Sequence, residues 1–168
     1  MGRCRPAIPS AEGRGKTGYY GKDHIVIVHG SPGAKSTIEK LLLDEAIRIV
    51  IIDTSPTSPF LHSRVHYVQG QPTDESVLAG ANILQASAIG LFASDAATDE
   101  VGMDGRTLLI ASILRQVLVA HDCEIYTVAE ATHESHVPHF RDLGINDVIL
   151  SHQPFSDIMT RSVLETGG

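Results

Sequence analysis

Tryptophan is absent from this 168-residue sequence, and only two cysteines occur, Cys4 and Cys123. Two cysteines separated by most of the chain form neither a disulfide framework nor a set of zinc ligands, which excludes disulfide-rich and zinc-finger proteins. No apolar run reaches the roughly 18 residues that a membrane helix needs, and no signal sequence opens the chain. We therefore expect a cytoplasmic domain.

Positive charge is also scarce. The chain has 13 basic and 20 acidic residues, a formal net charge of −7, so no general positive field attracts the phosphates of nucleic acid. The sequence lacks the Gly-x-Ser-x-Gly elbow of hydrolases and a cysteine with a base partner, which removes the usual signs of a catalytic nucleophile. These absences favour a binding domain over an enzyme.

The length and the 42% of hydrophobic residues fit one domain with a substantial core. Residues 1–22 are rich in glycine, proline and basic residues and lack apolar periodicity, so we expect a flexible tail or linker there and the domain at 23–168. From residue 23 onward, short apolar runs alternate with amphipathic segments. We expect six strands, at residues 25–28, 49–52, 65–68, 89–93, 125–129 and 148–150.

The apolar runs are continuous rather than alternating, which indicates strands covered on both faces and hence a parallel sheet between helices. A last helix is expected at 154–165, because apolar residues recur there at helical spacing. Residues 54–64 contain two prolines and no helical stripe, so this crossover is predicted to be an irregular loop. Right-handed crossovers then predict a doubly wound α/β sheet of Rossmann type, with six strands in the order 3-2-1-4-5-6.

The first predicted strand runs into a glycine-containing turn. In this fold, glycines let the backbone approach a pyrophosphate there, and the following helix N-terminus attracts anions. Gly30 and Gly33 are consistent with such a turn, although Pro32 and Lys35 stand where the Gly-x-Gly-x-x-Gly fingerprint has glycine. Asp53 ends the second strand and is placed to accept hydrogen bonds from a ribose. The candidate residues for NAD(H) or another adenine nucleotide are Gly30, Ser31, Gly33, Lys35 and Asp53.

Two other interpretations of this turn remain open. The glycines and Asp53 could only shape a tight turn and the end of a strand. Lys35 also resembles the lysine of an NTPase P-loop, but it lies one residue too close to Gly30 for that motif.

Acidic residues gather after the fourth predicted strand, at the edge where open α/β sheets usually bind ligands. Asp95, Asp99, Glu100 and Asp104 lie in a stretch predicted to be a loop, and Glu130 ends the fifth strand on the same edge. Oxygen clusters of this kind suit hard cations. The candidate ligands for Ca²⁺ or another divalent cation are Glu130, Asp95 and Asp99. A solvated acidic loop and a capping glutamate are the alternatives.

Three histidines, His133, His136 and His139, recur at spacings of three. On a helix they would share a face that could suit zinc or nickel. Pro138 is comfortable only in a first helical turn, so we expect a loop leading into a helix, with the histidines on the surface.

Three segments carry a family resemblance: HIVIVHGSPGAKSTIEKL (24–41), VQGQPTDESVLAGANILQASAIGL (68–91) and VAEATHESHVPHFRDLGINDVILS (128–151). Together they resemble the RCK domain, also called the TrkA-N or KTN domain, over about residues 23–165. The most specific piece is the Gly-x-Pro-Thr turn at residues 70–73, which is similar to the family's Gly-Asp-Pro-Thr with Gln71 in place of the acid. The second is Leu143-Gly144-Ile145 before the last strand.

This resemblance implies a domain that dimerises, joins tetramers or octameric rings, and attaches to a potassium channel pore or a transporter subunit at the inner face of the membrane. It also implies a small ligand, either NAD(H), an adenine nucleotide or a cation, whose binding is converted into gating. Glu130 matches a position where calcium-gated members have an acid. We expect the apolar helix at 154–165 to make the dimer contact.

We therefore predict a non-catalytic, cytoplasmic regulatory domain of a potassium channel or potassium transporter. Two alternatives stay open. A small NAD(P)-dependent oxidoreductase or epimerase-like protein would use the same glycine turn, and a structural dimerisation module would need no ligand.

Overall fold

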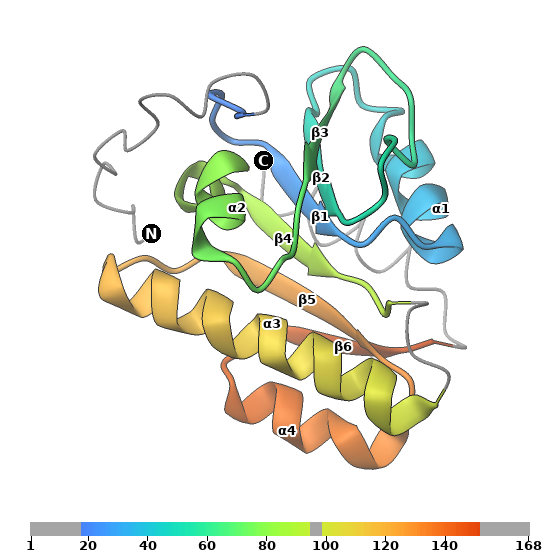
Figure 1. Ribbon diagram of the computed structural model, residues 1–168, viewed down its shortest axis with the longest axis vertical. Helices are drawn as coiled ribbons and strands as arrows, with labels where there is room; N and C mark the ends of the chain where they lie inside the picture. Colours follow the sequence, from blue (N-terminus) through green and yellow to red (C-terminus); the bar gives the residue numbers. More distant parts are fainter. Residues whose placement is uncertain (1–17, 95–98, 152–168) are drawn as a thin grey trace.

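Six parallel strands form one sheet in the order β3-β2-β1-β4-β5-β6, which confirms the predicted topology (Figure 1). The computed structural model describes residues 18–94 and 99–151. At the centre of the sheet, Val26 lies beside Val50 on one side and Ile89 on the other. The strands are β1 Ile25–Val28, β2 Ile49–Asp53, β3 Val65–Gln69, β4 Ala88–Leu91, β5 Tyr126–Ala131 and β6 Asp147–Leu150.

Helices cover both faces of this sheet. Successive strand residues point to opposite faces, so Ile25 and Ile27 join the core beneath α1, while Val26 and Val28 join the core beneath α2, α3 and α4. Figure 1 shows α4 lying alongside α3. The helices are α1 Pro32–Leu41, α2 Glu75–Gly80, α3 Glu100–Ala120 and α4 Val137–Asp142, with short 3-10 turns η1 Ile83–Gln85 and η2 Glu134–His136.

The crossover from β2 to β3 contains no helix, as its two prolines predict. Phe60 fills part of the space of the missing helix by packing against the core on the α1 face. Arg64 closes the far end of the crossover. Its guanidinium donates to three backbone carbonyls of the turn between α1 and β2: Leu42 (2.8 Å), Asp44 (2.7 Å) and Ile47 (3.0 Å).

The predicted tail and the predicted last helix fall largely outside the described residues. Residues 18–22, the final part of the expected tail, lie against the end of α2, where the Tyr19 N–H donates to the Gly80 carbonyl at 2.7 Å. Residues 1–17 and the helix expected at 154–165 are not described. Among residues 18–94 and 99–151, no helix combines the length and the hydropathy that a bilayer crossing requires.

Candidate functional site

The turn between β1 and α1 lies at the carboxyl edge of the sheet. β1 ends at Val28, and His29 then adopts a left-handed conformation with φ of 69°. Ser31 caps the helix, because its side chain accepts from the Ala34 N–H at 3.2 Å. Pro32 occupies the first helical position, where a missing N–H does no harm. The sequence therefore starts a helix immediately after the strand, as a nucleotide-binding turn requires.

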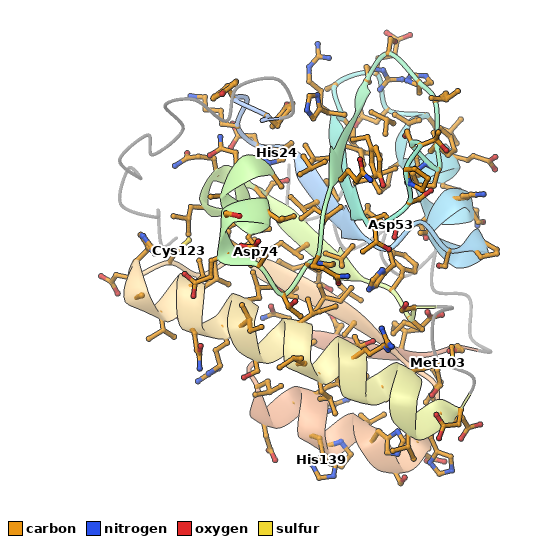
Figure 2. All side chains as sticks on the ribbon, in the orientation of Figure 1. His24, Asp53, Asp74, Met103, Cys123 and His139 are labelled. Atoms are coloured by element: carbon orange, nitrogen blue, oxygen red, sulfur yellow. The ribbon has the colours of Figure 1, made fainter. Side chains whose placement is uncertain are left out.

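Asp53, at the end of β2, reaches across to this turn (Figure 2). Its Oδ2 accepts from the Gly30 N–H at 3.0 Å, and its Oδ1 accepts from the Thr54 N–H at 2.8 Å. The His29 Nδ1 lies 3.6 Å from Oδ1. The structure thus brings the predicted residues Gly30 and Asp53 together. It also gives Asp53 a structural task, because the carboxylate closes the turn.

The two glycines of the turn differ in their surroundings. A Cβ on Gly30 would lie 2.3 Å from the Pro59 Cγ, so glycine is needed there for the crossover loop to pack on the turn. A Cβ on Gly33 would meet only Phe92 at 3.8 Å and the Ser31 Oγ at 3.9 Å, which are ordinary contacts. The packing of the described residues therefore leaves space beside Gly33.

The residues around Gly33 fit an anionic group. Its N–H lies in the first turn of α1 and has no acceptor in the described part of the chain, while the helix N-terminus carries partial positive charge. Lys35 is exposed two residues further along the helix, and no acidic residue lies in that first turn. Pro32 offers no N–H, so the turn can give fewer backbone donors to a phosphate than a full glycine fingerprint would.

Tyr67 belongs to the same edge of the sheet, and the sequence did not single it out. Its hydroxyl hydrogen bonds to the carbonyls of Asp53, at 3.1 Å, and Ser55. Burial raises the pKa of this hydroxyl above its ordinary value, and the negative charge of Asp53 adds to the rise. Its position follows from the strand register: Gln69 pairs with Asp53, and Tyr67 lies two residues earlier, on the same face of β3 as Gln69. His29, next to Gly30, was also missed.

The three candidate cation ligands are not brought together in the described residues. The Glu130 Oε1 accepts from the Ala93 N–H at 2.8 Å, which ties β5 to the end of β4. The Asp99 side chain accepts from the Gly102 N–H at 3.1 Å and caps α3. Asp95 lies outside the described residues. No group of three or more His, Cys, Asp or Glu side chains in the described ranges could hold a metal ion.

Asp104 does not lie in an acidic loop, which corrects the sequence prediction. It is a residue of α3 and is 1% exposed. Its carboxylate accepts from the Thr132 N–H at 2.9 Å, the His133 N–H at 3.3 Å and the His136 Nδ1 at 2.5 Å. A buried carboxylate needs such partners, since desolvation is otherwise too unfavourable. Asp104 lies seven residues before Ala111, which lies seven before Leu118, so all three share the buried face of α3. The sequence prediction overlooked this spacing.

The prediction that all three histidines lie on the surface is wrong for His136. His136 is half-buried and bonded to Asp104, whereas His133 and His139 are exposed. His139 points outward from α4 (Figure 2). The loop-then-helix prediction is confirmed, because Pro138 lies in the first turn of α4.

One family profile and two potassium channel proteins match this chain. The profile of the TrkA-N domain family matches residues 25–151. The calcium-gated potassium channel TvoK of Thermoplasma volcanium is 26% identical over 158 residues, and YugO of Bacillus subtilis, a candidate potassium channel protein, is 26% identical over 154 residues. These alignments cover 93% and 90% of this chain but only 44% of each relative, so the chain spans less than half the length of either protein.

Solved structures agree on the fold. The RCK domain of GsuK matches with a TM-score of 0.64 and 21% identity, over 84% of this chain and 30% of that one. The GsuK channel bound to NAD matches with a TM-score of 0.60 and 21% identity, over 77% and 21% of the two chains. Because the family profile spans all six strands and most of the sequence, this chain belongs to the TrkA-N domain family.

Proposed function

We propose that this chain is a cytoplasmic ligand-sensing domain of a potassium channel or potassium transporter, and that it binds an adenine nucleotide at the turn after β1. Both curated relatives are named for potassium channels, and GsuK has been solved with NAD and with ADP. The observation that carries the nucleotide proposal is the space and the unpaired N–H at Gly33, beside the turn that Asp53 closes.

The phosphate and the ribose of the nucleotide each have a partner in this proposal. A phosphate lies over Gly33, accepts from its N–H and pairs with the ammonium of Lys35, near the cap residue Ser31. Asp53 accepts from a ribose hydroxyl. A carboxylate has about four acceptor positions, and the N–H groups of Gly30 and Thr54 use only two of them.

Regulation follows from differential binding. A ligand shifts gating only if it binds one arrangement of the assembled subunits more tightly than another. A coupling of about 1–3 kcal/mol per site, repeated around an assembly, changes the open probability strongly. No bond of the ligand is made or broken in this scheme.

Assembly needs a contact surface, and the outer side of α3 supplies one. Val101, Leu109 and Val119 are exposed there by 68%, 55% and 66%, and a Cβ on Gly105 would meet no atom within 4 Å. Exposed apolar residues along one helix face favour a protein contact. We propose that a second copy of this chain covers this face, and that the helix at 154–165 of the domain 23–168 adds to the contact.

A divalent cation at Glu130, Asp95 and Asp99 is a second proposal, favoured by the calcium gating in the name of TvoK. Glu130 accepts from the Ala93 N–H and Asp99 accepts from the Gly102 N–H, so in this proposal a cation would bind carboxylates that already have hydrogen-bond partners. Glu130→Ala should then remove any rise in thermal stability on adding calcium.

Calorimetry and thermal unfolding with NADH, ADP, AMP and ATP test the nucleotide proposal. A ligand that binds only the folded state raises stability by RT ln(1 + [L]/Kd), about 2.7 kcal/mol at a hundredfold excess over Kd. Gly33→Ala is the cleanest variant, because its added methyl enters the proposed phosphate space without a clash in the protein. We expect it to weaken nucleotide binding at unchanged stability. Asp53→Ala should abolish the response.

The outcomes separate the alternatives. Undiminished nucleotide binding in both variants contradicts the site. No heat with any nucleotide or divalent cation supports the structural dimerisation module. Steady oxidation of NADH with a small substrate supports the oxidoreductase alternative instead.

A further inference from the structure

Residues 18–23 form a strap across the edge of the sheet opposite to the glycine turn. Three hydrogen bonds anchor this strap, and all of them reach the segment 80–85, which runs from the last residue of α2 to the end of η1. The bonds are Tyr19 N–H to the Gly80 carbonyl (2.7 Å), the Asn82 amide to the Gly21 carbonyl (2.6 Å) and Asp23 N–H to the Gln85 carbonyl (2.8 Å). Because the anchors share one segment, we expect the strap to open and close as a unit.

His24 follows the strap directly and is fully buried, with 0% exposure. It lies at the opposite end of the molecule's sheet from Asp53 (Figure 2). Its Nε2 lies 2.9 Å from the Ala81 carbonyl oxygen. A carbonyl only accepts, so Nε2 carries the proton and a neutral ring has a bare Nδ1. This Nδ1 is buried and has no hydrogen-bond partner among the described residues.

The strap itself covers His24. The Tyr19 ring packs on the His24 ring with centroids 4.5 Å apart, and His66 of β3 packs on Tyr19 at 5.5 Å. Gly21 allows this arrangement, because a Cβ there would lie 2.3 Å from the Tyr19 hydroxyl oxygen. The titratable groups around His24 are thus Tyr19, His66 and Asp23, since residues 80–87 contribute none.

We propose that the strap is a proton-sensitive latch, closed over neutral His24 and released when His24 takes up a second proton at Nδ1. In the closed form that proton would sit on a buried nitrogen without an acceptor, and only the carboxylate of Asp23 would offset the charge. In the open form water solvates both ring nitrogens. Release exposes Tyr19 and separates residues 18–23 from the segment 80–85.

The direction of the pH effect follows from burial. Burial lowers the pKa of His24, and the bond to Ala81 and the charge of Asp23 offset this only in part. Above the ordinary histidine pKa of about 6.5 both forms are neutral and the strap stays closed. As pH falls below that value, the ratio of closed to open strap falls about tenfold per pH unit, until the lowered pKa of the closed form is reached.

Amide hydrogen exchange of the full chain tests the latch, with rates corrected for intrinsic exchange, at about pH 7.5 and about pH 5.5. We expect protection of residues 18–24 and 79–87 to fall about tenfold at the lower pH, while β1, β2 and β4 keep theirs. Equal protection of the strap at both pH values would overturn the proposal.

His24→Gln isolates the titrating group, because glutamine can still donate to the Ala81 carbonyl but does not ionise. We expect its strap protection to be independent of pH, whereas the control His66→Gln keeps the wild-type response. A pH response that survives in His24→Gln contradicts the latch. Should this variant be open at every pH, the imidazole titration of wild-type His24 by NMR decides: a midpoint below about 6.5 supports the latch, and one at or above it overturns the proposal.

Discussion

Single polar side chains hold several loops of this protein against the sheet. Asp53 closes the glycine turn by accepting two backbone N–H groups, and Arg64 donates to three carbonyls of the turn before β2. His24 holds the segment after α2 through the Ala81 carbonyl. Apart from the Asp44 carbonyl, which also accepts from the Ile47 N–H, these backbone groups lie outside regular helices and strands, so loss of the side chain leaves polar groups unpaired.

The glycines of the turn give a prediction at this scale. Gly30→Ala should lower the free energy of unfolding by about 1–3 kcal/mol, because the new methyl overlaps the Pro59 ring and either the turn or the crossover loop must move. Gly33→Ala, whose methyl meets only ordinary contacts, should keep or slightly raise stability. Urea unfolding of the two variants measures the difference. Equal losses in both would show that Pro59 does not constrain the turn.

The residues of the candidate site were only partly predictable. The candidate residues Gly30, Ser31, Gly33, Lys35 and Asp53 follow from spacing relative to strands that the apolar runs define, and the structure places Asp53 in hydrogen-bond contact with Gly30. Tyr67 could not be chosen from the sequence, because its partners come from the loop after β2 and its role depends on strand register.

At the scale of elements, α3 is joined to the loop after β5 by one buried carboxylate. Asp104 accepts from the N–H groups of Thr132 and His133 and pairs with His136. The loop that follows Glu130 at the ligand edge is thereby fixed to the helix whose outer face we propose as a subunit contact. A rigid connection of this kind is one means by which ligand binding can alter assembly.

Breaking this connection is the second prediction. Asp104→Ala should lower the free energy of unfolding by about 3–5 kcal/mol, because it removes a buried carboxylate and leaves His136 and two backbone N–H groups without that partner. Asp99→Ala removes only a helix cap and should cost about 1 kcal/mol. Chemical denaturation of the matched pair measures both. A cost for Asp104→Ala no greater than that for Asp99→Ala would refute a central role for the carboxylate.

At the scale of the whole molecule, the described surface has its apolar residues concentrated on α3. Three of the large hydrophobic residues with high exposure belong to this helix: Val101, Leu109 and Val119. The opposite face of the helix is packed on the sheet through residues such as Leu114. A helix that is apolar on both sides is expected between two layers of protein rather than at a surface.

Self-association through α3 gives the third prediction. Leu109→Glu, at a position 55% exposed, should shift the chain toward monomer in sedimentation velocity runs, because a carboxylate would be buried in the contact. Leu43→Glu, at a position 83% exposed in the turn after α1, should leave association unchanged. Wild-type association in Leu109→Glu would exclude this face.

The sequence by itself determined the sheet, its strand order and which segments follow the carboxyl ends of the strands. Short continuous apolar runs indicate strands covered on both faces, and right-handed crossovers favour the doubly wound order that the structure confirms. These features depend on residues that are close together in the chain and on the repeating pattern of apolar residues, and both can be read from the sequence.

Only the tertiary structure decided which polar groups meet. Asp104 finds its partners some thirty positions away, and His24 is buried by a tyrosine ring from a segment without periodicity. The physical reason is that hydrogen bonds and buried charges depend on distances of a few ångströms between elements, whereas the hydrophobic pattern specifies only which face of each element turns inward.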